Sequence, residues 1–377
     1  MRELHFVRSG RLAWRAQTPP GPVDPDGAIV RPFLAARCDG DTLPIHRPVS
    51  RALQAGIAVG LVDPVVAAIC GRVPFRGPFC IGHECVAEVT AVGANVQTVR
   101  AGQTVIVPWA VSCGTCRSCR RGLTSKCDTA TRGRTLAAYG FGPSSGDYGG
   151  MITDALTVPY ADHMLVPVPA GVPPLRVAAA SDNLADGWRA VVPPLTDRGG
   201  GRVVILGGGA KSIGLYAAGL AIAHGAAAVD YLDDDAARRR IAEGFGARTG
   251  PLSRTGRLRG YDVAVEATSR PAGLRAALRA LAPGGICTAV GYYLASGTRL
   301  PLMQMYATDV TLHLGVSHPR ADLPELLAFV DRTGFPAEDV TTIVADWDDA
   351  PRAYPARTTK LVLQRERLPD RVGPTRA

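Results

Sequence analysis

Four cysteines lie close together at Cys113, Cys116, Cys119 and Cys127. They are separated by two, two and seven residues, a spacing that lets four thiolates close a tetrahedron around one zinc ion. Disulfides and free thiols are the other readings. The chain has nine cysteines, an odd number that points to a reducing cytoplasm, where disulfides are rare. We therefore favour zinc, and because sulfur would fill every position, this ion is expected to be structural.

A second set of metal-type ligands is dispersed along the chain. Cys38 and Asp41 belong to one short motif, His83 and Glu84 follow Gly82, and Asp182 precedes an apolar stretch. Taken singly, these residues read as a core thiol, a glycine turn and a helix N-cap. Their order around the cysteine-rich stretch favours a shared site instead.

Residues 203–233 read as a buried strand, a glycine-rich turn, an apolar helix and a second strand that ends at Asp233. Glycines between strand and helix let the helix N-terminal amides approach a pyrophosphate, and the acidic residue can accept hydrogen bonds from ribose hydroxyls. This order predicts dinucleotide binding, with a purely structural turn as the alternative. The candidate cofactor residues are Gly207, Gly209, Lys211, Ser212, Ile213, Gly214, Asp233, Arg238 and, after a later strand, Gly291.

The glycine-rich turn departs from the usual G-x-G-x-x-G spacing. It reads as a loop about two residues longer than usual, with Lys211 free to meet phosphate. A solvated loop lysine is the alternative. Asp233 favours NAD over NADP because a carboxylate repels a 2′-phosphate, and Arg238 could contact the same ribose.

The elements that carry these residues predict an α/β protein of two domains. Residues 1–175 contain short β-type runs separated by Gly and Pro, which favours an antiparallel, barrel-like domain. Helices alternate with strands in residues 176–320, a pattern typical of a doubly wound parallel sheet. Residues 321–377 are expected to rejoin the first domain, and the polar tail after residue 364 is expected to be disordered.

Composition excludes several classes of protein. Hydrophobic residues make up 46% and charged residues 20% of the 377, as in a globular enzyme. The net charge of +9 comes from arginines spread along the sequence, so nucleic-acid binding is not expected. We find no signal peptide and no membrane span, and expect a cytoplasmic protein without a membrane partner.

Together these features resemble the zinc-dependent medium-chain alcohol dehydrogenase superfamily over nearly the whole chain. The resemblance rests on Cys38-x-x-Asp41, Gly82-His83-Glu84, the four cysteines, Tyr148-Gly149-Gly150 and the stretch that ends at Asp233. Segments 158–165 and 181–188 are similar to the branch of glutathione-independent formaldehyde dehydrogenases, in which an aspartate is a zinc ligand.

The resemblance implies a GroES-like catalytic domain followed by a Rossmann NAD-binding domain. It implies a catalytic zinc on Cys38, His83 and Asp182, with Glu84 beside the metal and Asp41 orienting His83 or a neighbouring basic side chain. With the structural ion, this makes two zinc ions per chain. A homo-dimer or homo-tetramer acting on a small alcohol or carbonyl compound is also implied.

Three features depart from the family pattern. Gly40 stands where the family usually has the Ser or Thr that passes the alcohol proton outward, so Thr42 or His46 must replace it or there is no relay. Asp186 stands where the family usually has threonine. The stretch between Cys38 and His83 is longer than in compact members, and its added part, around residues 52–70, is expected to cover the substrate cleft.

Three functions follow from this pattern. The first is hydride transfer between NAD(H) and an alcohol, aldehyde or ketone held on zinc. The second, motivated by Gly40, is a zinc-containing reductase of a C=N or activated C=C bond, which needs no alcohol-proton relay. The third is an inactive, zinc-stabilised nucleotide-binding protein.

Overall fold

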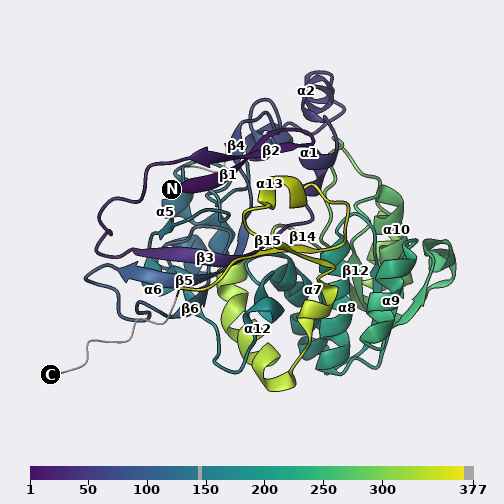
Figure 1. Ribbon diagram of the computed structural model, residues 1–377. Helices are drawn as coiled ribbons and strands as arrows, with labels where there is room; N and C mark the ends of the chain where they lie inside the picture. Colours follow the sequence, from purple (N-terminus) through teal and green to yellow (C-terminus); the bar gives the residue numbers. More distant parts are fainter. Residues whose placement is uncertain (143–146, 369–377) are drawn as a thin grey trace.

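A computed structural model describes residues 1–142 and 147–368 (Figure 1). Short strands dominate the first part of the chain, and strands alternate with helices from residue 202 onward. Figure 1 shows α8, α9 and α10 (green) on the side of the molecule opposite β3 and β5, with β15 and α13 (yellow) between them.

The first domain is built on a seven-stranded sheet in the order β15-β16-β3-β5-β6-β8, with β7 also paired to β3. A separate sheet has the order β2-β1-β4. The strands are β1 (Arg2–Arg8), β2 (Arg11–Ala16), β3 (Ala28–Ala36), β4 (Phe79–Cys80), β5 (Glu84–Val92), β6 (Thr104–Ile106), β7 (Leu156–Val158), β8 (Val166–Pro167), β15 (Ile343–Asp346) and β16 (Leu361–Gln364). This is the β-rich first domain that the short strands of the sequence predict.

Alternation along β5 explains how this sheet is buried on both faces. Cys85, Ala87 and Val89 pack into the core beside the cysteine-rich lobe, whereas Val86 packs into the core that includes α7. The strand that begins at Glu84 is therefore held rigidly between two cores, and it fixes the position of the preceding residue, His83.

The second domain is a six-stranded parallel sheet in the order β11-β10-β9-β12-β13-β14. This is the strand order of a Rossmann fold. The order reverses beside β9, which is the first strand of this sheet in the sequence. The strands are β9 (Arg202–Leu206), β10 (Ala228–Leu232), β11 (Arg248–Gly250), β12 (Tyr261–Glu266), β13 (Leu281–Ala289) and β14 (Thr311–Leu314). The long helices are α7 (Asn183–Arg198), α8 (Lys211–His224), α9 (Ala236–Gly244), α10 (Pro271–Ala280), α11 (Leu302–Thr308) and α12 (Pro319–Thr333).

The apolar run of β9 is continuous because helices cover both of its faces. Val203 and Ile205 pack in the core that contains α7 and α8, and Val204 and Leu206 pack in the core that contains α10. All four residues are fully buried. The carboxyl end of β9 is thus fixed between two layers, where the glycine-rich turn begins.

Short helices connect these elements. They are α1 (Thr42–His46), α2 (Ser50–Ala58), α3 (Val65–Cys70), α4 (Arg117–Arg120), η1 (Thr124–Lys126), α5 (Asp128–Thr131), α6 (Ala161–Met164), η2 (Pro174–Val177), η3 (Leu252–Arg257), η4 (Ala337–Val340) and α13 (Ala350–Ala353). The turn between α2 and α3 pairs Val62 with Ala295, and Asp63 N donates to Leu294 O at 2.9 Å. Leu294 lines the main cavity but residues 52–70 do not, so this segment borders the cleft and does not form its lining.

The C-terminal part returns to the first domain. β16 pairs antiparallel with β3, with Val362 opposite Ala36. Beyond it, Arg365 forms an ion pair with Asp154 at 3.1 Å, so the placed chain continues past residue 364 to residue 368. The rest of the predicted disordered tail, residues 369–377, lies outside the described residues.

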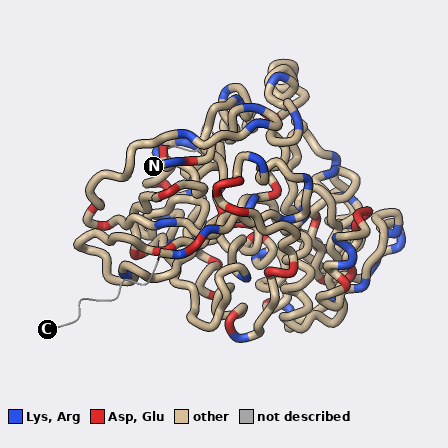
Figure 2. Tube along the Cα trace, in the orientation of Figure 1, with Lys and Arg blue, Asp and Glu red and all other residues tan. Residues whose placement is uncertain are grey.

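Charged side chains are mixed over the surface. Figure 2 shows basic and acidic residues interspersed along the whole trace. Among the described residues, no helix has both the length and the apolar character that a bilayer crossing requires.

Candidate functional site

Three potential metal ligands from distant parts of the chain meet at the junction of the two domains. Cys38 follows β3, His83 precedes β5, and Asp182 precedes α7. One ligand atom of each lies within 4.8 Å of the others. Cys38 Sγ is 3.1 Å from Asp182 Oδ2, and His83 Nε2 is 3.5 Å from the same oxygen. The predicted ligands are therefore brought to one point.

The imidazole of His83 supports a cation at this point. Both of its ring nitrogens are buried, and neither has a hydrogen-bond partner among the described residues. A buried nitrogen of this kind needs a partner, and a metal ion would supply one for Nε2. Burial alone lowers the pKa of His83, but Asp41 and Asp182 outweigh it and raise the pKa to about 9. The pocket is thus electronegative, and its sulfur, nitrogen and oxygen donors fit zinc.

A set of neighbouring groups fixes the orientation of the three ligands. Asp41 Oδ1 lies 3.8 Å from His83 Nδ1, and Tyr354 Oη donates to Asp41 Oδ2 at 2.8 Å. Ser317 Oγ donates to Asp182 Oδ1 at 2.9 Å and accepts from the Trp109 ring N–H at 3.0 Å. One oxygen of Asp182 is thereby held away from the trio while the other faces it.

Cys38 also receives donors that suit a thiolate. Gly40 N lies 3.2 Å and Asn183 Nδ2 lies 3.3 Å from Cys38 Sγ. In the absence of a bound cation, burial, followed by the nearby carboxylates, raises the pKa of this thiol well above its usual range. A metal ion would reverse that effect, because a coordinating thiol loses its proton.

Glu84 belongs to a second buried network behind the trio. Its carboxylate pairs with the ammonium of Lys360, which also donates to Arg37 O at 3.0 Å and to Asn183 Oδ1 at 2.8 Å. Asn183 N donates to Glu84 Oε1 at 2.8 Å. Both charged side chains are completely buried, so their pairing is essential to this part of the core.

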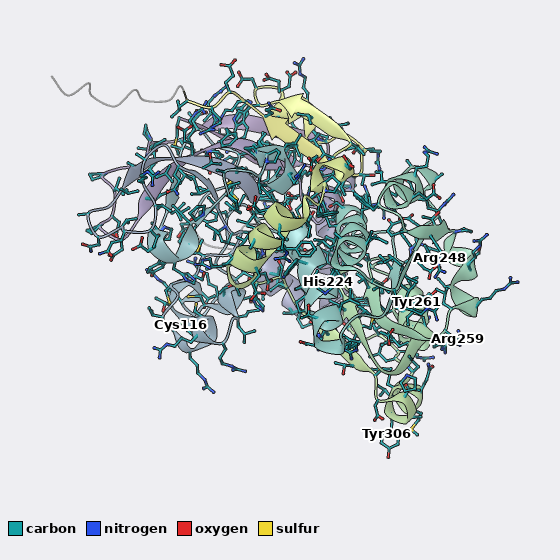
Figure 3. The ribbon with its side chains drawn as sticks, turned by 90° about the horizontal axis from the view of Figure 1, so that it is seen from below. Cys116, His224, Arg248, Arg259, Tyr261 and Tyr306 are labelled. Carbon is teal, nitrogen blue, oxygen red and sulfur yellow. The ribbon has the colours of Figure 1, made fainter. Side chains whose placement is uncertain are left out.

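The four clustered cysteines form a separate lobe around α4, η1 and α5. Their sulfur atoms lie within 4.8 Å of one another, and all four thiols are free. Cys116 Sγ and Cys127 Sγ are 3.8 Å apart. A tetrahedron with zinc–sulfur bonds of about 2.3 Å has edges of about 3.8 Å, so these positions fit one zinc ion. Figure 3 shows Cys116 in this lobe at the periphery of the molecule.

Backbone amides in the lobe point at the sulfur atoms. Cys116 N lies 3.4 Å from Cys113 Sγ, and Ala130 N lies 3.3 Å from Cys127 Sγ. Although burial raises the pKa of Cys113, hydrogen bonds from Thr129 and its neighbours outweigh burial and lower the pKa to about 5. The pKa of Cys116 is also lowered, whereas burial raises the pKa of Cys119 and of Cys127, so a bound cation would be needed to hold all four as thiolates.

The glycine-rich turn follows β9 and leads into α8. A Cβ atom at Gly207 would lie 2.4 Å from Asp233 Oδ2 and 2.5 Å from Tyr231 Oη, so only glycine fits there. Gly214 lets α8 pack closely against β9. Of the other candidates, Gly209, Lys211, Ile213 and Gly291 line the main cavity, whereas Ser212 is fully buried behind it.

The N-terminus of α8 is capped by the first domain. Asp39, next to Cys38, accepts hydrogen bonds from Ser212 N at 2.7 Å, Ser212 Oγ at 3.0 Å and Ile213 N at 3.3 Å. These two amides are therefore occupied by Asp39 in this conformation. Lys211, on the same loop, lies at the cavity wall.

Asp233 is likewise engaged within the protein. Arg238 donates to both of its carboxylate oxygens, at 2.6 and 2.7 Å. Tyr231 Oη and Asp235 N donate to the same carboxylate at 2.9 and 2.8 Å. Four donors use the roughly four lone-pair sites of a carboxylate, and the side chain is almost fully buried. In this conformation Asp233 shapes the cavity but does not offer a free acceptor to a ribose.

One cavity of about 620 Å³ connects the metal-type ligands with the glycine-rich turn. Cys38 and Asp182 lie in its wall, as do Lys211, Asp233 and Arg238. Such a cleft, at the point where the strand order reverses, is where Rossmann folds bind dinucleotides. The metal-type ligands and the glycine-rich turn therefore share one continuous space.

Comparisons with known proteins agree with this architecture. Residues 56–170 match the alcohol dehydrogenase GroES-like domain family. A Mycobacterium tuberculosis protein described as a "probable zinc-binding alcohol dehydrogenase" is 27% identical over 94% of this chain and 84% of its own length. The solved alcohol dehydrogenase TADH from Thermus sp. ATN1 is 26% identical, covers 97% of this chain and 99% of its own, and superposes with a TM-score of 0.79. By these matches the chain is similar over nearly its whole length to zinc-dependent medium-chain alcohol dehydrogenases.

A further relative bears on the branch within this superfamily. Glutathione-independent formaldehyde dehydrogenase of Pseudomonas aeruginosa is 32% identical over 55% of this chain and 53% of its own length. As a medium-chain dehydrogenase, the chain is a zinc-dependent enzyme that carries out NAD(P)-linked oxidoreduction. The third candidate function, an inactive nucleotide-binding protein, is therefore wrong.

The two predicted relay residues of this dehydrogenase are turned to the backbone. Thr42 Oγ1 donates to Asp39 O at 2.7 Å, and His46 Nε2 lies 2.9 Å from Pro355 O. Both line the cavity, but neither has been brought to Gly40, where the family's hydroxyl usually stands. Asp186, in the same wall, is paired with Arg189 at 2.5 Å.

Sequence reasoning missed several residues that complete the site. Lys360 and Tyr354 come from the C-terminal part, Ser317 follows β14, and Asp39 caps α8. Only Asp39 had a local signal, because it adjoins the ligand Cys38. Tyr354 and Lys360 reach the site through the return of the chain, and Ser317 reaches it from the end of the parallel sheet; no spacing in the sequence reveals either contact.

Proposed function

We propose that this enzyme transfers hydride between a small alcohol and NAD, with a catalytic zinc held by Cys38, His83 and Asp182. The observation that carries the proposal is the unpartnered, buried His83 imidazole beside a thiol and a carboxylate, in a cavity that continues to the glycine-rich turn. Zinc at this point would lower the pKa of a bound hydroxyl and polarise a bound carbonyl.

The residues around the trio would prepare it for this chemistry. A thiolate and a carboxylate offset both charges of the ion, so the buried site is formally neutral. Asp41 and Ser317 would hold His83 and Asp182 in place, which keeps the donor atoms aimed at one point. Glu84 would remain paired with Lys360 behind them.

We also propose a second, structural zinc on Cys113, Cys116, Cys119 and Cys127. The sulfur positions and the amides that point at them support this assignment. η1 of the lobe contacts the loop that carries Ser317, after β14, because Ser125 Oγ donates to Ser317 O at 2.5 Å. The lobe would therefore stabilise the fold and the wall of the catalytic site together.

The cavity wall supports an alcohol with an apolar substituent. Trp109 and Phe141 stack with ring centroids 4.9 Å apart, and Phe141 lies 5.0 Å from the His83 ring. Leu294 and Val316 also line the cavity. Aromatic and branched alcohols would bury apolar surface here, worth about 25 cal/mol per Å².

A substrate panel tests the proposed function. Purified zinc-loaded enzyme is mixed with NAD and a series of primary, secondary and aromatic alcohols, and with NADH and matched aldehydes, imines and activated alkenes. We expect NADH to form with alcohols and to be consumed with aldehydes, fastest for aromatic members. Turnover confined to the C=N or C=C compounds would instead support the reductase that Gly40 first suggested.

The preference for NAD is proposed on a run of three acidic residues at the end of β10. Asp233 is used internally, but Asp234 lines the cavity and has one oxygen bonded to Leu252 N at 3.0 Å. Its other oxygen is available to a ribose hydroxyl. We therefore assign the ribose contact to Asp234, with Asp233 and Arg238 as its rigid support.

Substitution of Asp234 tests this assignment. Asp234→Ala should raise KM for NAD about tenfold, since a hydrogen bond to a charged group contributes about 1.5 kcal/mol or more. The control is Asp331→Ala, an exposed aspartate outside the cavity. Steady-state kinetics with both cofactors is the measurement, and the wild-type enzyme should show the higher kcat/KM with NAD. A wild-type preference for NADP would contradict the proposal.

The predicted homo-dimer or homo-tetramer also remains a proposal. Among the described strands, β14 has a neighbour in the sheet on one side only. Exposed apolar residues gather in the same segment, at Leu302, Met303, Tyr306 and Leu314. Figure 3 shows Tyr306 pointing away from the body of the molecule. These features support a subunit contact at this edge. The cytoplasmic location is likewise proposed on the free cysteines alone.

A further inference from the structure

A tyrosine hydroxyl occupies the space beside Gly40. A Cβ atom at Gly40 would lie 3.0 Å from Tyr292 Oη, 3.3 Å from Tyr292 Cε2 and 3.5 Å from Cys38 Sγ. Tyr292 comes from the loop after β13, in the second domain, whereas Gly40 follows the ligand Cys38 in the first. The two residues therefore meet across the cleft, next to the candidate metal ligand.

The absence of a side chain at position 40 leaves the space that the Tyr292 ring occupies. Contacts of 3.0–3.3 Å to a Cβ atom are tighter than ordinary packing, so a side chain at position 40 would require Tyr292 to shift by a few tenths of an ångström. Gly40 is therefore the residue that makes room for Tyr292. A hydroxyl thus stands beside position 40, but it comes from the opposite wall of the cleft.

The Tyr292 hydroxyl is free to act on a ligand. Tyr292 lines the main cavity with Cys38 and Asp182, and half of its surface is exposed. Among the described residues, its hydroxyl has no hydrogen-bond partner, whereas Thr42 and Ser317 have theirs. A phenol is neutral at pH 7 and can both donate and accept.

We propose that Tyr292 is a catalytic residue that contacts the substrate oxygen and passes the alcohol proton outward, in place of a hydroxyl at position 40. This inference rests on the proposed function. In oxidation the substrate O–H bond breaks and its proton moves to Tyr292 Oη. The proton that Tyr292 held passes to a water molecule in the cavity, while hydride leaves the substrate carbon for NAD. In reduction each transfer runs in reverse.

The first test removes only the hydroxyl. Tyr292→Phe should lower kcat for alcohol oxidation about 100-fold, within the range of general acid–base catalysis, with a smaller change in KM. The loss should shrink as the pH rises, because hydroxide can then remove the proton directly. Tyr293→Phe is the matched control, since Tyr293 donates to Glu266 and does not line the cavity.

A binding measurement provides a readout other than turnover. Trifluoroethanol carries an alcohol oxygen but resists oxidation, and its binding to the enzyme–NAD complex can be followed by protein fluorescence. Tyr292→Phe should weaken this binding about tenfold, the effect of one lost hydrogen bond. Tyr293→Phe should leave it unchanged.

A double substitution tests whether a hydroxyl at position 40 can replace the hydroxyl of Tyr292. Gly40→Ser should lower both kcat and the thermal midpoint of the cofactor-free enzyme, because the serine collides with Tyr292. In a Tyr292→Ala background the collision is gone, so Gly40→Ser should leave the midpoint unchanged and raise kcat at least tenfold above that of Tyr292→Ala. This rescue would identify the hydroxyl, and not the ring, as the active element.

The outcomes separate this inference from the proposed function. Wild-type enzyme that turns over no alcohol would overturn the proposed function itself. Wild-type enzyme that is active, with Tyr292→Phe unchanged in kcat, pH profile and trifluoroethanol binding, would overturn only the role of Tyr292. If kcat falls in Tyr292→Phe but Gly40→Ser does not raise it in the Tyr292→Ala background, the idea that a hydroxyl at position 40 can replace that of Tyr292 is rejected.

Discussion

Cys38→Ala and Asp182→Ala should each reduce kcat by at least about 1,000-fold while the protein stays folded. A metal that polarises the reacting oxygen supplies several kcal/mol of transition-state stabilisation, and each 1.36 kcal/mol is a factor of ten in rate. Both side chains face a cavity of about 620 Å³, so their loss affects chemistry more than packing. Rates with the best alcohol from the panel, together with circular dichroism, are the measurements.

Cys80→Ala serves as the matched control for these variants. Cys80 is a partly buried free thiol close in sequence to His83, but it does not belong to either cluster of potential ligands. It should retain wild-type activity. Near-normal turnover in Cys38→Ala or Asp182→Ala would refute the ligand assignment, because each variant removes one of the three described donors of this cluster.

Cys116→Ser should have the largest effect on stability. Four thiolates around zinc contribute folding free energy directly. We expect the apparent thermal midpoint to fall by about 10 °C or the protein to become insoluble, corresponding to a loss of several kcal/mol. Scanning fluorimetry and metal analysis are the measurements, and zinc should fall from two ions to one per chain.

Cys116→Ser should also affect activity, through the contact between the lobe and Ser317. Because Ser125 donates to Ser317, and Ser317 holds Asp182, loss of the lobe metal should also lower kcat in any folded fraction. Cys80→Ser is the control here, since it makes the same change of element outside the lobe. Two zinc ions and an unchanged midpoint in Cys116→Ser would mean that the four sulfurs do not share a metal.

Local patterns explain why the fold was predictable from sequence. The β-branched run before Gly207 becomes β9, because helices bury both of its faces, and the apolar stretch after Lys211 becomes α8. The predicted Rossmann order follows from this unit, and the GroES-like domain follows from the short strands that precede it. Both are confirmed by the sheets and by the family match.

The candidate site was predictable only in part, for a physical reason. Cys113 to Cys127 form one short segment, so their spacing alone indicates a cluster. Cys38 and Asp182 are far apart, and the resemblance to a family, not spacing, brought them together. Lys360 packs against Glu84 only because β16 pairs with β3, a contact between distant strands.

The contacts among the candidate cofactor-binding residues could not be predicted from the sequence. Sequence placed Asp233 at the end of a strand and Arg238 five residues further on, but it could not tell that they bind each other. Five residues apart across a strand-to-helix turn, they meet because α9 begins immediately after β10. Tyr292 was missed entirely, because the only sign of it was an absence at Gly40.

The central claim is that one zinc ion is bound jointly by Cys38, His83 and Asp182. Anomalous X-ray diffraction from crystals of the zinc-loaded enzyme, with data on both sides of the zinc absorption edge, tests it most directly. We predict two peaks per chain, one among the four lobe sulfurs and one in contact with Cys38 Sγ, a nitrogen of His83 and an oxygen of Asp182. A map with a lobe peak but no peak at those three side chains would contradict the account.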